Sequence, residues 1–184
     1  MNRDSNQEPK DSDLISRAKE GDFEAFGELY QRYVDLIYRY IRTRVSENRS
    51  AEDLTEMVFL KAFEALDRYQ ERGWPFSSFL YHVARNQLAD HYRRQRDEVP
   101  LEEAYDLEAS PEFPNREDGV IDRVHALQKA LEKLPEDYQE IIRLRILLEL
   151  STSEVAAILD RSEGAIRVLL HRALKALRKQ IEQK

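Results

Sequence analysis

The sequence predicts an all-α protein with two small helical domains joined by an acidic, flexible linker. Apolar residues recur at spacings of three and four along most of the chain, as in helices with one buried face. Glycine and proline are scarce, at 5 and 6 of 184 residues. No stretch alternates apolar and polar residues long enough to indicate a sheet. We expect a polar leader over 1–10, a first domain over 11–96, the linker over 97–119 and a second domain over 120–184.

The composition excludes several classes of function. Because the chain has no cysteine, disulfides, thiolate chemistry and zinc knuckles are excluded. It has neither an uninterrupted apolar run of membrane-spanning length nor a signal-like apolar core at its start, so we expect a cytoplasmic protein without membrane insertion. The four histidines lack metal-motif spacing, and no nucleophile–base pair or phosphate-binding loop is visible. We therefore expect no enzymatic activity, no metal and no cofactor.

The net charge of −7 is unevenly distributed along the chain. Residues 97–119 carry 1 basic and 9 acidic groups, whereas residues 160–184 carry 7 basic and 3 acidic groups. The positive charge therefore gathers at the C-terminal end. A patch this small predicts weak DNA affinity on its own, because nonspecific affinity rises with the number of phosphates neutralised. A larger DNA-binding partner fits this pattern.

The first domain is predicted to be a helical bundle. A short helix runs to Glu20, Gly21 and Asp22 break and recap it, and a long helix with a core-facing aromatic stripe ends near Val45. The next helix, over 53–69, has more apolar residues than one buried face requires. Its carboxylates Asp53 and Glu56 would then lie beside exposed apolar groups, as on a partner-binding helix. A central helix of a simple bundle is the alternative.

An aromatic loop precedes a basic helix at the end of this domain. Residues 70–75, QERGWP, interrupt the helical pattern and place Trp74 in a polar loop. The helix that follows, over 76–96, has cations and an amide on its outer side. Cations that follow phosphates, together with groups that receive unstacked bases, are typical of single-strand binding. Packing of Trp74 against its own bundle is the alternative.

The second domain ends in a predicted helix-turn-helix, preceded by helices over 120–134 and 136–149. Ser151 and Glu154 have capping-box spacing, Asp160 lies at the turn, and Ser162 is an N-cap residue for the second helix. The second helix is predicted to bury one stripe and leave a mixed, mainly basic face outside. Its buried stripe is Ile166, Leu169, Leu170, Ala173, Leu174 and Leu177. The exposed face fits the major groove of DNA. A helical hairpin with a solvated basic face is an equally good interpretation of this stretch alone.

The order of these segments resembles the extracytoplasmic-function sigma factors, the two-domain bacterial transcription initiation subunits of the sigma-70 superfamily. The resemblance covers nearly everything except the leader and the linker. Its segments are GDFEAFGELYQRY, SAEDLTEMVFLKAFEAL, SSFLYHVARNQLADHYRR, LEKLPEDYQEIIRLRILLELSTSEVAAIL and SEGAIRVLLHRALKALR.

The resemblance implies a role in promoter recognition by RNA polymerase. Asp53 and Glu56 would bind the β′ clamp helices of the core enzyme, and the β flap would be a further contact on the polymerase. The minus-ten element would be read and melted by Tyr69, Gln70, Glu71, Arg72, Gly73, Trp74, Arg85, Asn86, Arg93 and Arg94. The minus-35 element would be read by Ser162, Glu163, Ala165, Arg167, Val168, His171 and Arg172.

The resemblance also implies partners and location. An anti-sigma factor would control the protein, and the acidic linker would run through polymerase toward the RNA exit path. The protein would associate with the nucleoid in holoenzyme, or lie near the membrane when an anti-sigma factor holds it there. Two other functions are kept beside this one: a stand-alone helix-turn-helix transcriptional regulator and a helical protein-interaction adaptor.

The chain departs from the family pattern at several positions. Glu56-Met57 stands where Gln-Glu is usual, Asp160 where glycine is usual, and Arg161 where an apolar residue is usual. Phe79 replaces a common tryptophan, and the loop before it is longer and bulkier than in many members. These departures affect the polymerase contact, the turn geometry and the promoter sequence preference.

Overall fold

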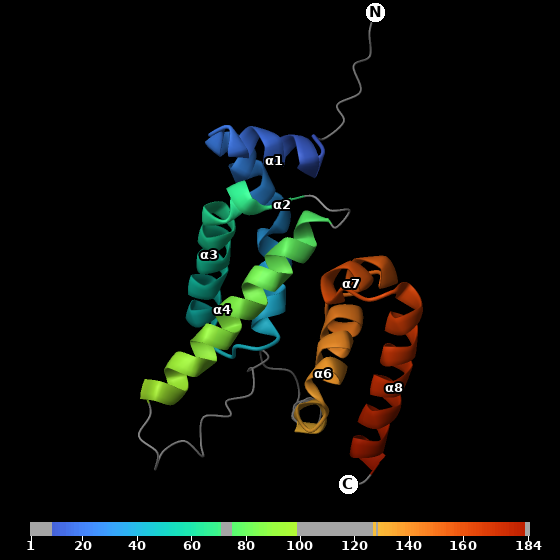
Figure 1. Cartoon of the computed structure of the whole chain (residues 1–184). Coiled ribbons are helices and arrows are strands. Elements are labelled where there is room, and N and C mark those ends of the chain that lie inside the picture. Colours follow the sequence, from blue (N-terminus) through green and yellow to red (C-terminus); the bar gives the residue numbers. More distant parts are fainter. Residues whose placement is uncertain (1–8, 71–74, 99–126, 128, 183–184) are drawn as a thin grey trace, which may run out of the picture.

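The computed structural model describes residues 9–70, 75–98, 127 and 129–182, which form two helical domains and contain no strand (Figure 1). The all-α prediction is confirmed. The N-terminal elements are α1 (Asp11–Lys19), α2 (Phe23–Arg42), α3 (Asn48–Glu64), the 3₁₀ turn η1 (Leu66–Arg68) and α4 (Phe76–Glu98). The C-terminal elements are α6 (Glu136–Ile142), the π-helical turn η2 (Arg143–Leu147), α7 (Thr152–Leu159) and α8 (Glu163–Glu182). Most of the predicted linker lies outside the described residues.

The N-terminal core is centred on α2, which packs against α1, α3 and α4. Its inward residues Leu29, Ile37 and Ile41 are fully buried, and they meet Val58 of α3 and Leu80 of α4 in one core. Burial of such aliphatic side chains stabilises the fold by about 1.5 to 3 kcal/mol each. The aliphatic part of the stripe predicted for this helix therefore has the core role expected of it, but the prediction was wrong for its aromatic residues Phe23 and Tyr30, which are exposed.

The turn between α1 and α2 forms where glycine and aspartate were predicted to break and recap the helix. Gly21 has a φ of 94°, which side-chain-bearing residues rarely adopt. Asp22 then caps α2, because its Oδ1 accepts hydrogen bonds from the backbone N–H groups of Glu24 and Ala25. The side chain of Arg17 also donates to Asp22. These donors, Arg17 first and Ala25 next, lower the pKa of the Asp22 carboxyl.

Three helices end earlier than their apolar patterns predict, and the first of them, α2, ends at Arg42 and not near Val45. The helix expected over 53–69 stops at Glu64, because the tight turn η1 directs Leu66 into the core, where it is 2% exposed. The helix expected over 136–149 is regular only to Ile142 and continues as η2. The wider π turn leaves Ile146 and Leu147 about half exposed, and Glu149 follows with a φ of 57°. In the other direction, α4 runs two residues beyond its predicted end.

The C-terminal domain packs α8 against α6 and α7. Ile166, Ala173 and Leu177 form the buried stripe of α8, with Leu169 and Leu170 partly buried beside them. The prediction for Leu174 was wrong, because its side chain is 41% exposed. It lies one position beyond Ala173 around the helix, at the edge of the face that α6 and α7 cover.

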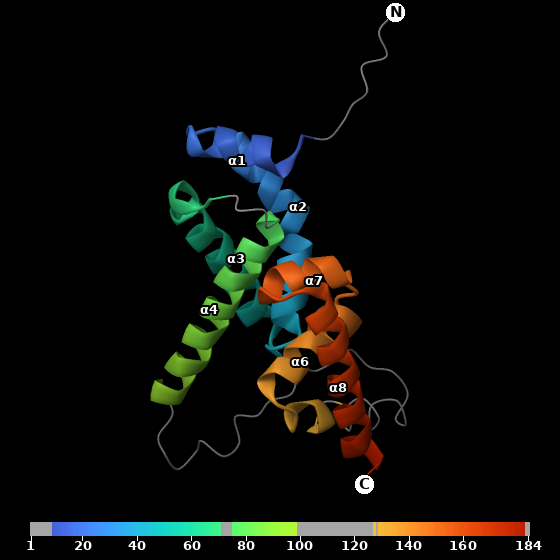
Figure 2. The ribbon, with the colours of Figure 1, turned by 45° about the vertical axis from the view of Figure 1, so that its right-hand side comes forward.

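The two domains touch through α4 and α7, with α8 on the side away from α4 (Figures 1 and 2). Two tyrosines lie close to this contact. Tyr40 of α2 and Tyr81 of α4 meet edge to face at a centroid distance of 5.0 Å, and both are fully buried. The Tyr40 hydroxyl donates to Glu140 Oε1 at 2.7 Å. Among the described residues, the Tyr81 hydroxyl has no hydrogen-bond partner.

Tyr81→Phe is expected to stabilise the protein. The substitution keeps the ring and removes a buried hydroxyl, whose burial costs about 1 to 3 kcal/mol when it lacks a partner. We expect the free energy of unfolding in urea to rise by about 1 kcal/mol. Tyr40→Phe is the matched control, because it removes a hydroxyl that is hydrogen-bonded and should therefore destabilise. Equal effects of the two substitutions would contradict the assignment.

Candidate nucleic-acid interface

The helix-turn-helix begins with the predicted capping box. The backbone N–H of Glu154 donates to Ser151 Oγ at 3.2 Å, and the Glu154 carboxylate accepts from the Ser151 N–H at 2.7 Å. Each side chain thus satisfies a backbone donor that the helix end leaves free. Behind this cap, Val155 and Ile158 are buried. The first helix of the motif is therefore fixed at both its cap and its inner face.

The turn between α7 and α8 forms despite the absence of glycine. Asp160 adopts the left-handed conformation, with φ 50° and ψ 49°, and the N–H of Arg161 closes the turn on Ala156 O at 3.0 Å. Arg161 forms an ion pair with Asp137 of α6 at 2.7 Å. An exposed ion pair thus stands where the family usually has an apolar residue, and it connects the turn to α6.

Asp160→Gly is expected to stabilise the C-terminal domain. Left-handed backbone is unfavourable for residues with a Cβ, and glycine adopts it freely at helix C-termini. We expect about 0.5 to 1 kcal/mol more free energy of unfolding by chemical denaturation. Ser153→Gly serves as the control, because that position is exposed and helical, and glycine should destabilise it. A loss of stability in Asp160→Gly would contradict the role of the turn conformation.

The exposed face of α8 presents the residues predicted to read DNA. Ser162 Oγ accepts from the N–H of Ala165 at 3.2 Å, as the predicted N-cap should. Glu163 and Arg167 form an ion pair at 2.6 Å, yet the Arg167 side chain is still 66% exposed. The structure brings the whole predicted set to one exposed surface: Ser162, Glu163, Ala165, Arg167, Val168, His171 and Arg172. Guanidinium groups on an exposed helix can bond the acceptors of guanine in the major groove.

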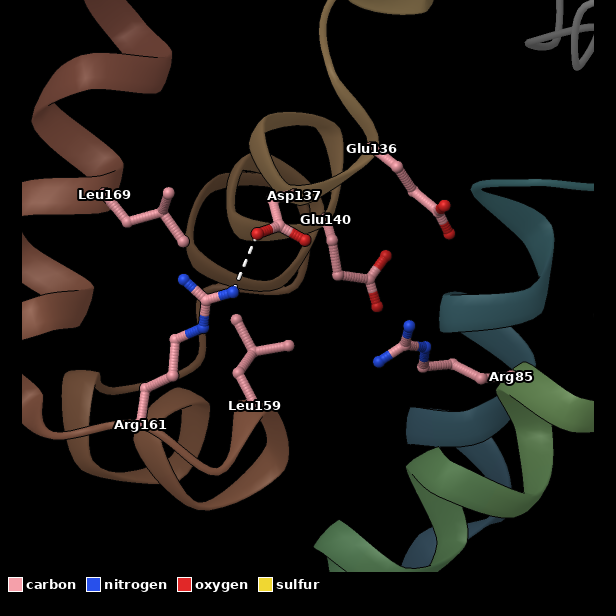
Figure 3. Close-up of a pocket in the computed structure, with 7 residues that line it drawn as sticks. All are labelled: Arg85, Glu136, Asp137, Glu140, Leu159, Arg161 and Leu169. Carbon is pink, nitrogen blue, oxygen red and sulfur yellow. Dashed lines mark hydrogen bonds and ion pairs between the residues drawn. The ribbon is translucent and has the colours of Figure 1, made fainter.

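A second candidate surface lies on α4, where it faces the C-terminal domain. His82, Arg85 and Asn86 line a cavity of about 280 Å³, together with Glu136 of α6. Arg85 also lines a neighbouring cavity of about 220 Å³, where it reaches from α4 toward the carboxylate of Glu140 (Figure 3). Burial, and then Arg85, lower the pKa of His82. Arginine therefore supplies the positive charge on this part of α4.

The remaining predicted minus-ten residues are only partly brought together. On α4, Arg93 is exposed and paired with Asp90 at 2.9 Å, and Arg94 is exposed. Gln70 is also exposed. The predicted residues Glu71, Arg72, Gly73 and Trp74 lie outside the described residues.

Tyr69 is anchored by contacts that the sequence did not reveal. Its ring lies 5.6 Å from Phe76 and 5.0 Å from Phe79, centroid to centroid. Lys19 of α1 donates to the Tyr69 carbonyl oxygen at 2.6 Å and also lies 5.9 Å from the ring centroid. Phe79, which stands where the family often has tryptophan, is thus half buried in an aromatic cluster. The backbone that leads into the loop is held at its first residue.

A third surface lies on α3. The carboxylates Asp53 and Glu56 are exposed, as predicted, and they share the helix with the exposed side chains of Met57 (39%) and Leu60 (50%). Phe23 of α2 is 73% exposed and packs its ring 5.9 Å from Phe63 of α3. Carboxylates beside exposed apolar groups are typical of a protein-binding surface.

Sequence reasoning missed the polar contact between the domains. Glu140 of α6 is bonded to Tyr40 and Arg44 of the N-terminal domain and is only 5% exposed. The one available signal was a carboxylate directly before the buried pair Ile141 and Ile142. From the sequence, a glutamate at such a position is expected on the exposed side of a helix, because its partners lie about 100 residues away in the chain and cannot be recognised.

The comparisons with known proteins agree with this arrangement. Residues 29–98 match the model of sigma-70 region 2, and residues 125–177 match the model of sigma-70 region 4. The ECF RNA polymerase sigma factor SigD of Mycobacterium bovis is 36% identical over 177 residues, which cover 91% of this chain and 82% of SigD. The chain belongs to the extracytoplasmic-function (ECF) sigma factors of RNA polymerase. As a sigma factor, it acts in transcription initiation, and sigma factors are not a catalytic family.

A further relative and a solved structure show the range of the similarity. The ECF sigma factor BldN of Streptomyces coelicolor is also 36% identical, over 167 residues that cover 90% of this chain, and the chain spans 63% of the length of BldN. The solved structure of CnrH in complex with the cytosolic domain of CnrY has the same fold, with a TM-score of 0.67 at 23% identity. That match covers 95% of this sigma factor and 98% of CnrH.

Two features are absent from the described residues of this sigma factor. No helix there is long and apolar enough to cross a membrane. No group of three or more histidine and acidic side chains in the same residues is arranged to hold a metal ion.

Proposed function

We propose that this sigma factor directs core RNA polymerase to promoters by reading the minus-35 element with α8 and the minus-ten element with α4 and the loop before it. The observation that carries the proposal is the capped helix-turn-helix, whose second helix leaves all seven predicted reading residues exposed. A chain with both sigma-70 regions supplies the context that a stand-alone regulator or an adaptor would lack.

At the minus-35 element, α8 would lie in the major groove with its N-terminal turns against the bases. Arg167 and Arg172 would donate to guanine, and Val168 would meet a thymine methyl group. The N-terminus of the helix and Ser162 would contact phosphate, since free N–H groups and the helix dipole favour anions there. The side chains would therefore select the base sequence, and the N-terminus of α8 would fix where the helix lies along the DNA.

At the minus-ten element, the proposal assigns strand capture to the loop 69–75 and to α4. Tyr69 and Trp74 would receive unstacked bases, Asn86 would bond a base edge, and Arg85, Arg93 and Arg94 would contact phosphates. Stacking contributes about 1 to 3 kcal/mol per base, which is comparable with the cost of unpairing. The packing of the Tyr69 ring against Phe76 and Phe79 supports this assignment, because a fixed ring loses less freedom when a base stacks on it.

Polymerase would bind through α3 and through the C-terminal domain. Asp53 and Glu56 would meet cations of the β′ clamp helices, with Met57 and Leu60 packing beside them, and the exposed Ile146 and Leu147 of η2 would meet the β flap. We also propose that an anti-sigma factor covers the apolar α3 surface in the cytoplasm. A native pull-down that recovers only polymerase under all growth conditions would contradict the anti-sigma proposal.

Run-off transcription tests the proposed function directly. Purified protein, core RNA polymerase and a pool of genomic fragments should yield transcripts from a small set of start sites that share upstream sequences. Core enzyme without the protein should yield none of them. DNA binding of the protein alone should be weak, because its basic region has a net charge of only +4 over residues 160–184. Tight, sequence-specific DNA binding without polymerase would favour the stand-alone regulator.

A further inference from the structure

The two domains are joined by a buried polar cluster around Glu140. Its carboxylate accepts from the Tyr40 hydroxyl at 2.7 Å and forms an ion pair with Arg44. The side chains of Glu140 and Arg44 are 5% and 15% exposed, and Tyr40 is fully buried. A carboxylate of the C-terminal domain is therefore inserted between two partners from the N-terminal domain.

This cluster holds more positive than negative charge. Arg143 of η2 lies close enough to influence the same groups, and its side chain donates to Gln139 at 2.8 Å. Burial, and then the nearby charge of Arg44, lower the pKa of Arg143. Burial also acts to lower the pKa of Arg44, but Tyr40 and Glu140 outweigh it, and the pKa of Arg44 is raised. The Nε atoms of both arginines are buried without a hydrogen-bond partner among the described residues. Glu140 thus offsets the charge of two largely buried guanidinium groups.

The two domains are packed too closely together to bind both promoter elements. Elements centred about 25 base pairs apart lie roughly 85 Å apart at 3.4 Å per base pair of duplex DNA. Domains that share a 2.7 Å hydrogen bond cannot read both elements at once.

The same arrangement limits access to α4. Arg85 and Asn86 face cavities of about 220 and 280 Å³, whose other walls include Glu136 and Glu140 of α6. These cavities are smaller than the roughly 300 to 1,000 Å³ that single small ligands occupy. The carboxylates also place negative charge where a phosphate would bind.

We propose that Glu140 is an intramolecular latch that holds the C-terminal domain over α4 and keeps the free sigma factor from engaging polymerase and promoter with both domains until the domains separate. The inference rests on the proposed function, because it assumes that both domains act on one promoter. The latch is suited to opening. A buried ion pair adds little net stability, since desolvation offsets its attraction, while loss of one partner leaves a buried charge unpaired.

The test measures the distance between the domains in the full-length chain. Because the protein has no cysteine, Ser16→Cys on α1 and Lys179→Cys on α8 provide two unique labelling sites, and both positions are exposed. Single-molecule energy transfer between the labels should show mainly one compact population. Glu140→Gln should increase the open population at least about tenfold, because the guanidinium groups remain without their carboxylate. Glu149→Gln, an exposed position with the same charge change, should leave the distribution unchanged.

Arg143→Met is expected to change the open population in the opposite direction. It removes the excess positive charge and keeps an apolar stem of similar length, so the open population should fall. Circular dichroism will show whether each variant keeps its helices. If Glu140→Gln does not fold, Tyr40→Phe, which removes only the hydroxyl donor, should open the molecule to a smaller degree. Unchanged distances in the folded Glu140 or Tyr40 variant, or an Arg143 variant that opens, would overturn the proposal.

The functional readout is the rate at which the protein forms holoenzyme with fluorescent core RNA polymerase. The apparent rate of association with polymerase should rise in Glu140→Gln, because more molecules are open, and should fall in Arg143→Met. An open Glu140→Gln variant that binds polymerase no faster than wild type would overturn the latch alone, provided that wild-type holoenzyme transcribes. Wild-type protein that yields no promoter-specific transcript would instead overturn the proposed function.

Discussion

Arg167→Ala and Arg172→Ala are each expected to reduce transcription from a minus-35-dependent promoter by about 5- to 150-fold. This range corresponds to the roughly 1 to 3 kcal/mol that a bidentate contact to guanine contributes. Both side chains lie exposed on the outer face of α8, whose buried stripe of Ile166, Ala173 and Leu177 is anchored in the C-terminal core. Helix position should therefore be unaffected, and the loss should come from the contact itself.

The measurement is run-off transcription on the cognate promoter and on one with a scrambled minus-35 element. Each variant should lose activity on the first template and should differ little from wild type on the second. Lys179→Ala is the control, because it removes an exposed cation near the end of the same helix, away from its N-terminal reading turns. Wild-type activity of both arginine variants on the cognate promoter would remove α8 from the proposed minus-35 site.

Glu56→Arg is expected to weaken binding to core polymerase by about 30-fold, or roughly 2 kcal/mol. The carboxylate is exposed on α3 beside Met57 and Leu60, where a cation of the partner would approach it. Reversal of the charge places like charges together, which is costlier than loss of one attraction. The stability of the free protein should change little, because the side chain lies at the surface.

Fluorescence titration of core enzyme with labelled protein, at low and high salt, measures this effect. The difference between Glu56→Arg and wild type should shrink as salt rises, since screening weakens surface electrostatics. Glu20→Arg is the matched control, because it is an exposed glutamate at the end of α1 that undergoes the same change of charge. Equal losses in both variants would indicate a general charge effect and would contradict a specific contact on α3.

Local patterns predicted the elements whose determinants lie close together in the sequence. The capping box at Ser151, the N-cap at Ser162 and the recapping turn at Gly21 all formed as predicted. In each case the residues that decide the structure lie within a few positions of one another. The exposed face of α8 follows from the same periodicity, because its apolar stripe fixes which residues point outward.

Features that depend on tertiary contacts could not be predicted in this way. The end of α3 depends on where Leu66 meets α1, and the exposure of Leu174 depends on how far α6 and α7 extend around α8. The partners of Glu140 lie 96 and 100 residues away, so no sequence window contains them.

If α8 reads the minus-35 element as proposed, the ion pair between Glu163 and Arg167 bears on how a promoter is chosen. A glutamate can accept a hydrogen bond from cytosine and an arginine can donate to guanine, but each side chain holds the other while the pair is intact. A base that engages one of them frees its partner to engage the next base. Neighbouring positions of the preferred promoter should therefore be correlated, and tables that score each base independently will misjudge the strength of sites at this step.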